Sequence, residues 1–248
     1  MTGELDGGNS NVVERVGDTV HRLSGPWTPA VHRLLHLLRA SGIDQVPQPL
    51  GFDDDGREIL TFLEGETGNY PLPAWLWTPT ILDEAGALLR RIHDASVPLV
   101  AEDLVWAHPA RQPAEVICHN DVAPYNMAFT DGHLVGLFDF DTASPGPRIW
   151  DLAYLAYRLA PLGEDVGPSA PVGAAQLERL DRLAAAYGQP FSRSEMLSAV
   201  VERLHELADD SDRRAVDAGR SYLRDHAAMY RRDAAVVAGL EQTLRLDL

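Results

Sequence analysis

The segment CHNDVAPYN, residues 118–126, constrains the fold of this chain most, because it crowds polar side chains between two apolar runs. The runs on either side, 115–118 and 127–129, are short and β-like. A polar loop between rigid neighbours is a common place for chemistry. The sequence therefore predicts a functional loop that carries His119, Asp121 and Asn126.

Another carboxylate follows this loop. Asp139 stands at the end of the apolar run 134–138. Asp and Asn side chains offer hard oxygen ligands, and the pattern lacks the Cys and His pairing that is typical of zinc. Asp121, Asn126 and Asp139 would therefore suit Mg²⁺ that bridges nucleotide phosphates. The alternative is that Asp121 and Asn126 are only turn residues, a frequent use of Asp and Asn.

The order of these residues is that of phosphoryl transfer in the kinase fold, where one Asp orients the substrate hydroxyl while an Asn and a second Asp hold metal ions. Asp121 is then the predicted catalytic residue, and Asn126 and Asp139 are the predicted metal ligands. His119 is expected to support the loop backbone rather than to move protons. A metal-dependent phosphohydrolase would use the same ligands but would release phosphate without an acceptor.

The chain is strongly acidic, with 21 Lys and Arg against 37 Asp and Glu and a formal net charge of -16. Nucleic-acid binding is disfavoured, because the phosphate backbone rewards clustered Lys and Arg. A cationic small molecule would be attracted, although acidity can also serve solubility alone.

The single cysteine, Cys118, excludes an internal disulfide and a cysteine-rich metal site, and a buried, inert thiol is expected. Residues 1–10 lack the basic and apolar regions of a signal peptide. No apolar run approaches the roughly 20 residues of a membrane span. We expect a cytoplasmic protein without a membrane partner.

The first part of the chain, residues 1–66, is predicted to be a small β-rich lobe. Its elements follow the order strand, strand, helix, strand, strand, at 11–16, 19–23, 28–42, 49–52 and 58–63. Gly17 and Asp18 form the first turn, and Thr28 is the expected N-cap of the helix.

The remainder, residues 67–248, is predicted to be a larger, mostly helical lobe with a small β element. A helix begins at Thr78 and Pro79, and Ser192 with Glu195 forms a capping box. The expected strands are 126–130 and 133–138, and later helices are expected at 174–187, 194–208 and 213–244. The fold class is α+β.

Three motifs resemble a known family. HNDVAPYN at 119–126, FDFD at 138–141 and WDLA at 150–153 look like the signature of the aminoglycoside phosphotransferase and choline kinase-like family. The preceding order of elements also agrees, so the resemblance covers nearly the whole chain. It implies a bilobal protein-kinase-like fold with ATP as donor, Asp121 as catalytic residue, and Asn126 and Asp139 on metal. Asp151 would anchor the catalytic loop.

The resemblance also implies nucleotide contacts in the first lobe. Arg22 is the candidate for the strand residue on the phosphates, usually Lys, and its planar fork would change the contact geometry. The Glu that normally pairs with that Lys is not evident. His32 stands near its place, with a merely half-buried histidine as the alternative. The hinge is expected at 61–65, where the backbone of three residues would contact adenine: Phe62, Leu63 and Glu64.

The phosphate-covering loop is expected at 7–11, where Gly8 and Asn9 could offer backbone N–H groups. It is not the full glycine motif of kinases, and disordered glycines are the alternative. Only six residues precede the loop, so the first strand must be short or missing. The donor is ATP, with GTP as a second candidate.

A protein kinase is disfavoured, because no glycine follows the metal Asp and the stretch between Asp141 and Trp150 is too short for a peptide-binding segment. Asp141 is either a second metal-side carboxylate or structural. We expect a small hydroxylated acceptor, an aminoglycoside or another amine-bearing metabolite. The alternative is a nucleotide-binding pseudoenzyme or interaction module of the same fold.

The acceptor site is expected among the helices that follow Asp151. An acidic group there either binds ammonium groups or is a solvated helix end: Glu202, Glu206, Asp209, Asp210 and Asp212.

Overall fold

The structure is a computed structural model that describes residues 2–4, 13–163, 167, 169–217 and 219–246. The chain divides into two compact units. The first unit contains Met1–Gly68 and Arg90–Arg148, and the second contains Asn69–Leu89 and Ile149–Leu248. Helix α2 (Pro79–Ser96) begins in the second unit and ends in the first.

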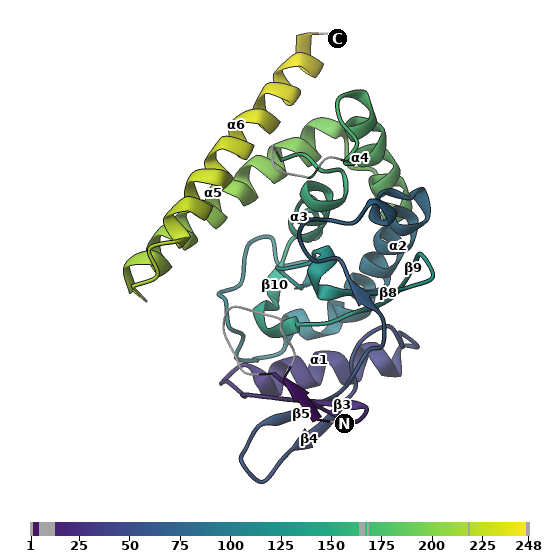
Figure 1. Ribbon diagram of the computed structural model, residues 1–248, viewed down its shortest axis with the longest axis vertical. Coiled ribbons are helices and arrows are strands. Elements are labelled where there is room, and N and C mark those ends of the chain that lie inside the picture. The colour runs from purple at the N-terminus through teal and green to yellow at the C-terminus, as the bar shows by residue number, and fades with distance from the viewer. Residues whose placement is uncertain (1, 5–12, 164–166, 168, 218, 247–248) are drawn as a thin grey trace. The chain divides into compact units, whose positions relative to one another are not determined.

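A five-stranded antiparallel sheet begins the first unit, with strand order β1-β2-β3-β5-β4 (Figure 1). The strands are β1 (Thr2–Glu4), β2 (Glu14–Val16), β3 (Thr19–Arg22), β4 (Pro49–Phe52) and β5 (Glu58–Thr61). Gly17 takes a positive φ of 62° in the turn between β2 and β3, which suits glycine. The predicted element order is confirmed, and β1 is the short first strand that was expected.

Helix α1 (Thr28–Ala40) buries the apolar face predicted for it, which includes Val31, Leu34 and Leu38. Its N-cap position is Trp27, so the prediction that Thr28 is the N-cap is wrong by one residue. The Thr28 hydroxyl instead accepts a hydrogen bond from the Gly25 backbone N–H at 2.9 Å. The Thr28 side chain therefore closes the turn, residues 25–28, through which the chain enters the helix.

The rest of the first unit is a set of short strands and 3-10 turns. Three strands form an antiparallel sheet in the order β6-β8-β9, and β7 pairs with β10. Their bounds are β6 (Glu66–Thr67), β7 (Val116–Cys118), β8 (Met127–Thr130), β9 (His133–Leu137) and β10 (Ser144–Gly146), with 3-10 helices η2 (Val97–Ala101), η3 (Pro124–Asn126) and η4 (Phe140–Thr142). The predicted β element is confirmed. The polar loop lies between β7 and β8, and Asp139 follows β9.

The second unit is helical. It contains η1 (Ala74–Trp77), α4 (Ala174–Tyr187), α5 (Arg193–Asp217), α6 (Leu223–Leu246) and all but the first residue of α3 (Arg148–Leu159). α5 and α6 lie side by side (Figure 1). The capping box is confirmed, because the Ser192 N–H donates to the Glu195 carboxylate at 2.8 Å and the Glu195 N–H to the Ser192 hydroxyl at 3.2 Å.

The helix at 174–187 is confirmed, but the predicted break after residue 208 is wrong. α5 continues through the acidic run to Asp217, and Gly219, with a φ of 63°, follows its end. Within the described parts of the chain, no helix has the length and apolar character needed to cross a membrane.

Candidate active site

The carboxylate of Asp121, the predicted catalytic residue, is held by two neighbours in its own loop. Its Oδ1 accepts a hydrogen bond from the Tyr125 hydroxyl at 2.6 Å, and its Oδ2 accepts one from the Asn126 amide nitrogen at 2.9 Å. The same nitrogen donates to the Asp121 carbonyl at 2.8 Å. The amide oxygen is therefore the atom that Asn126 can offer to a metal.

His119 connects this loop to the strand that carries Asp139. Its Nδ1 accepts from the Asp121 backbone N–H at 3.2 Å, so the ring proton belongs on Nε2, which donates to the Phe138 carbonyl at 2.9 Å. The ring is buried and packs on Phe140, with centroids 4.5 Å apart. Both ring nitrogens therefore serve the backbone, as a supporting residue requires.

Asn120 is a supporting residue that the sequence analysis did not single out. Its φ of 66° lies in the left-handed region, which Asn tolerates better than most residues. Its amide nitrogen donates to the Thr142 carbonyl at 2.7 Å and to the Ser144 hydroxyl at 2.9 Å. The Thr142 hydroxyl returns a bond to the His119 carbonyl at 2.8 Å. These bonds fix the loop against the segment after Asp139.

Asp139 also has left-handed backbone geometry, with a φ of 65°. Such a conformation costs on the order of 1–3 kcal/mol for a non-glycine residue, and surrounding contacts must maintain it. The Phe138 N–H, one residue earlier, donates to the Asn126 carbonyl at 2.9 Å. The Asp139 side chain remains 45% exposed, so its carboxylate is both fixed and accessible.

Arg22, at the end of β3, contacts three carboxylates with three different nitrogens. Its Nε donates to Glu58 at 2.6 Å, its Nη1 to Asp139 at 3.0 Å and its Nη2 to Asp141 at 2.5 Å. Burial lowers the pKa of Arg22, but Asp141, Glu58 and Asp139 together raise it above its ordinary value. A lysine ammonium could not present this planar fork.

Glu58 is the partner that the sequence analysis missed. It lies on β5 directly opposite Arg22 in the strand register and is 1% exposed. His32, on α1, reaches Glu58 rather than Arg22, with its Nε2 2.8 Å from Oε2. In the sequence, the signal for Glu58 was a charged residue at the start of an apolar strand. The strand register is needed to show that Arg22 is the cation that pairs with it.

Asp141 shares the Arg22 fork with Asp139. Burial is the main cause that raises the pKa of Asp141, to about 6, while the Arg22 guanidinium opposes the shift and Asp139 and Glu58 add to it. The Trp27 side chain also hydrogen-bonds to this carboxylate. Three carboxylates thus surround one guanidinium, and such a cluster favours a further cation.

Some groups of the predicted hinge already contact other residues of the chain. The Phe62 backbone N–H donates to the Asp18 carbonyl at 2.8 Å. The Arg15 guanidinium lies 3.7 Å from the centre of the Phe62 ring and also pairs with Glu64. The predicted adenine contacts therefore fall to the Phe62 carbonyl and to the backbone of Leu63 and Glu64. Gly8 and Asn9 lie outside the described residues.

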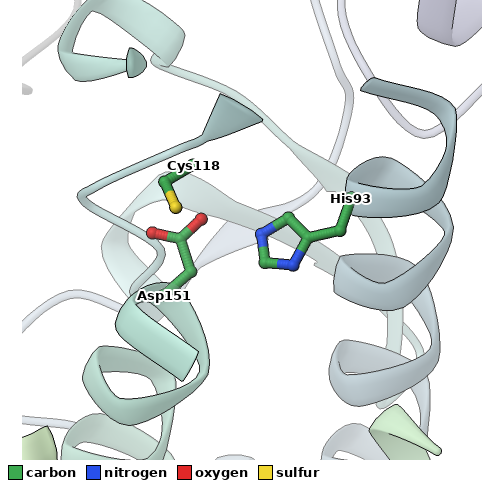
Figure 2. A group of neighbouring side chains, drawn as sticks. All are labelled: His93, Cys118 and Asp151. Carbon is green, nitrogen blue, oxygen red and sulfur yellow. The ribbon is translucent and has the colours of Figure 1, made fainter. Parts of the chain in front are cut away.

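Two further predicted positions are buried. Asp151, in the first turn of α3 (Figure 2), belongs to the second unit and is 0% exposed. Its proposed role as anchor of the catalytic loop stays a prediction. Cys118, at the end of β7 (Figure 2), is 1% exposed, and its thiol donates to the Pro147 carbonyl at 3.4 Å. The expected burial of this thiol is confirmed.

The three aspartates of the acidic group in the second unit pair with arginines. Arg231, on α6, contacts Asp209 at 3.2 Å and Asp212 at 2.7 Å, and Arg213 contacts Asp210 at 3.2 Å. These carboxylates lie within α5, so the expected helix end is wrong. Their contacts favour a solvated helix face over an ammonium site.

Residues 97–189 match the sequence profile of a family described as "Phosphotransferase enzyme family". A trifolitoxin immunity protein of Rhizobium leguminosarum bv. trifolii is 36% identical over 168 residues. That match covers 65% of this chain and 63% of the relative, so the chain spans only 63% of the length of this curated relative.

Solved structures are similar over almost the whole chain. A spectinomycin phosphotransferase, solved with ADP and spectinomycin, has a TM-score of 0.68 at 14% identity, covering 97% of this chain and 93% of that one. A choline/ethanolamine kinase family protein from Mesorhizobium loti has a TM-score of 0.59 at 18% identity, covering 96% and 92%.

The chain therefore has the protein-kinase-like fold of these solved structures, and the predicted fold class is confirmed. The profile match is confined to residues 97–189, less than half of the chain. The profile match and the solved structures both confirm the resemblance to aminoglycoside phosphotransferases and choline kinases.

Proposed function

We propose that this chain is an ATP- and Mg²⁺-dependent phosphotransferase that phosphorylates a hydroxyl group of a small molecule. One observation carries the proposal. Asp121 is held by Tyr125 and Asn126, and His119 ties its loop to the strand end that carries Asp139. The fixed positions of a proton acceptor and of metal-binding oxygens are what phosphoryl transfer requires of a protein.

In this mechanism Asp121 orients the acceptor hydroxyl and takes its proton as the oxygen attacks the γ-phosphorus. Tyr125 and Asn126 hold the carboxylate in position, so little reorganisation is needed at the moment of reaction. The bond that forms joins the acceptor oxygen to phosphorus, and the bond that breaks joins phosphorus to the leaving ADP. Arg22 would balance negative charge on the phosphates.

The oxygen donors near Arg22 fit Mg²⁺. Asn126 would supply its amide oxygen and Asp139 a carboxylate oxygen, with Asp141 as a further candidate. Bound magnesium would neutralise the phosphates and favour transfer. The excess of carboxylate over guanidinium charge around Arg22 supports this assignment.

For the acceptor we propose a hydroxylated, amine-bearing molecule. The net charge of -16 would attract such a cation, and the structural neighbour that binds spectinomycin supports this class. The curated relative is named as an immunity protein against a toxin, and phosphorylation of a toxin is one way to give immunity to it.

Substitution of Asp121 tests the proposal directly. Asp121→Ala should reduce turnover at least about 10³-fold, because no other carboxylate in the loop can orient the hydroxyl. ADP release would be measured with a panel of hydroxylated amines, together with the melting temperature of each protein. Near-normal turnover by a folded Asp121→Ala variant would refute the mechanism.

A second candidate is a nucleotide-binding module without catalysis. The observation that favours it is the engagement of Arg22 with Asp139 and Asp141, which uses the cation expected on the phosphates. Nucleotide binding without ADP release for any acceptor, in the unmodified chain, would support this candidate over an enzyme.

A further inference from the structure

Glu58 holds the Arg22 guanidinium from its Nε side. Its Nε bonds to Glu58, and this leaves both Nη groups on the side of Asp139 and Asp141. A guanidinium is planar and rigid, so a bond at Nε fixes the plane in which the two Nη groups lie. The direction of those groups therefore depends on Glu58.

Glu58 is itself held at both carboxylate oxygens. Oε1 accepts from Arg22 at 2.6 Å, and Oε2 lies 2.8 Å from His32 Nε2. The His32 ring stacks on Phe52 with centroids 5.3 Å apart. Because the carboxylate is 1% exposed, water does not compete for it. A chain of contacts thus runs from α1 through Glu58 to the fork of Arg22.

We infer that Glu58 is a positioning residue for nucleotide binding, which acts through Arg22 and is supported by His32. This inference rests on the proposed function. In protein kinases a glutamate from the helix orients the basic strand residue. Here the carboxylate comes from β5, the strand beside Arg22, and the helix supplies a histidine that holds the carboxylate.

The first test compares two charge-removing variants of the same sheet. Glu58→Gln keeps the size of the side chain but weakens the bond that orients Arg22. The matched control is Glu14→Gln, because Glu14 pairs with Arg57 at 2.9 Å and does not contact Arg22. Calorimetric titration with Mg·ADP should give about tenfold weaker binding for Glu58→Gln and no change for Glu14→Gln.

A double-variant cycle shows whether Glu58 acts through Arg22. Arg22→Gln alone and Arg22→Gln with Glu58→Gln should bind Mg·ADP equally weakly, because the carboxylate has nothing left to orient. Losses that add, or unchanged affinity in Glu58→Gln, would overturn the inference. If Glu58→Gln does not fold, His32→Gln replaces it, with an expected loss of about threefold and the same absence of additivity with Arg22→Gln.

The experiments distinguish failure of the proposed function from failure of this inference alone. Absence of any nucleotide binding by the unmodified chain would overturn both the proposed function and this inference. Normal Mg·ADP binding with additive losses would overturn the inference alone. In the turnover assay Glu58→Gln should raise the KM for ATP more than it lowers kcat, whereas Asp121→Ala should affect kcat.

Discussion

At the scale of single residues, His119 ties the proposed catalytic loop to the segment before Asp139. It accepts from the Asp121 N–H and donates to the Phe138 carbonyl, so one ring links Asp121 to the residue that precedes Asp139. Both bonds are to backbone groups. The role of His119 is thus separable from proton transfer.

Replacement by alanine should therefore weaken both the fold and the chemistry. His119→Ala leaves a partly buried N–H and a partly buried carbonyl without their partner, which should lower the free energy of unfolding by about 1–3 kcal/mol. A displacement of Asp121 by about 1 Å should also cost roughly 10²-fold in kcat. Denaturant unfolding and initial rates would measure the two effects.

The control for this prediction is nucleotide affinity. Arg22 and Glu58 do not contact the His119 ring, so the dissociation constant of Mg·ADP should change far less than kcat. A folded His119→Ala variant with unchanged kcat would show that the loop needs no support from this ring.

At the scale of elements, those features were predictable from sequence whose whole signal lies within one segment. The turn at Gly17, the β8–β9 pair and the polar loop each follow from local residue types and spacing. Glu58 could not be found in this way, because its partner Arg22 is set by strand register. The end of α5 was misplaced because the acidic run looks like a helix end until Arg231 of α6 is seen beside it.

The β4–β5 hairpin offers a pH prediction. Asp53 accepts hydrogen bonds from His21 at 3.0 Å and from the Arg57 N–H at 2.8 Å and Nε at 2.8 Å. The hydrogen bond from His21 is the main cause that lowers the pKa of Asp53 from 3.8 to about 2, and the Arg57 contacts act in the same direction.

Because the pKa of Asp53 is lower in the folded chain, the carboxylate stabilises the fold above its ordinary pKa. That contribution should disappear as the pH falls from about 4 to about 2. Asp53→Asn should therefore melt at a lower temperature than the unmodified chain at pH 7, and the gap should close towards pH 2. A constant gap across this range would contradict the assignment.

At the scale of the whole molecule, the charge of -16 works against an anionic nucleotide unless cations compensate locally. Arg22 is one such cation, but Glu58, Asp139 and Asp141 surround it. A free nucleotide would therefore be repelled, whereas a magnesium complex would bring the missing positive charge. Nucleotide binding by this chain should therefore depend on metal.

The melting temperature should show whether nucleotide binding depends on magnesium. At a ligand concentration a hundred times the dissociation constant, mass action adds about 2.7 kcal/mol to the free energy of unfolding. For a chain of this length, that should raise the melting temperature by about 5–10 °C. ATP with magnesium should produce the shift, and ATP with a chelator should not. Asp139→Asn is the matched variant, and it should lose the magnesium-dependent part of the shift while still folding. An equal shift with and without magnesium would mean that the carboxylates around Arg22 do not serve a metal ion.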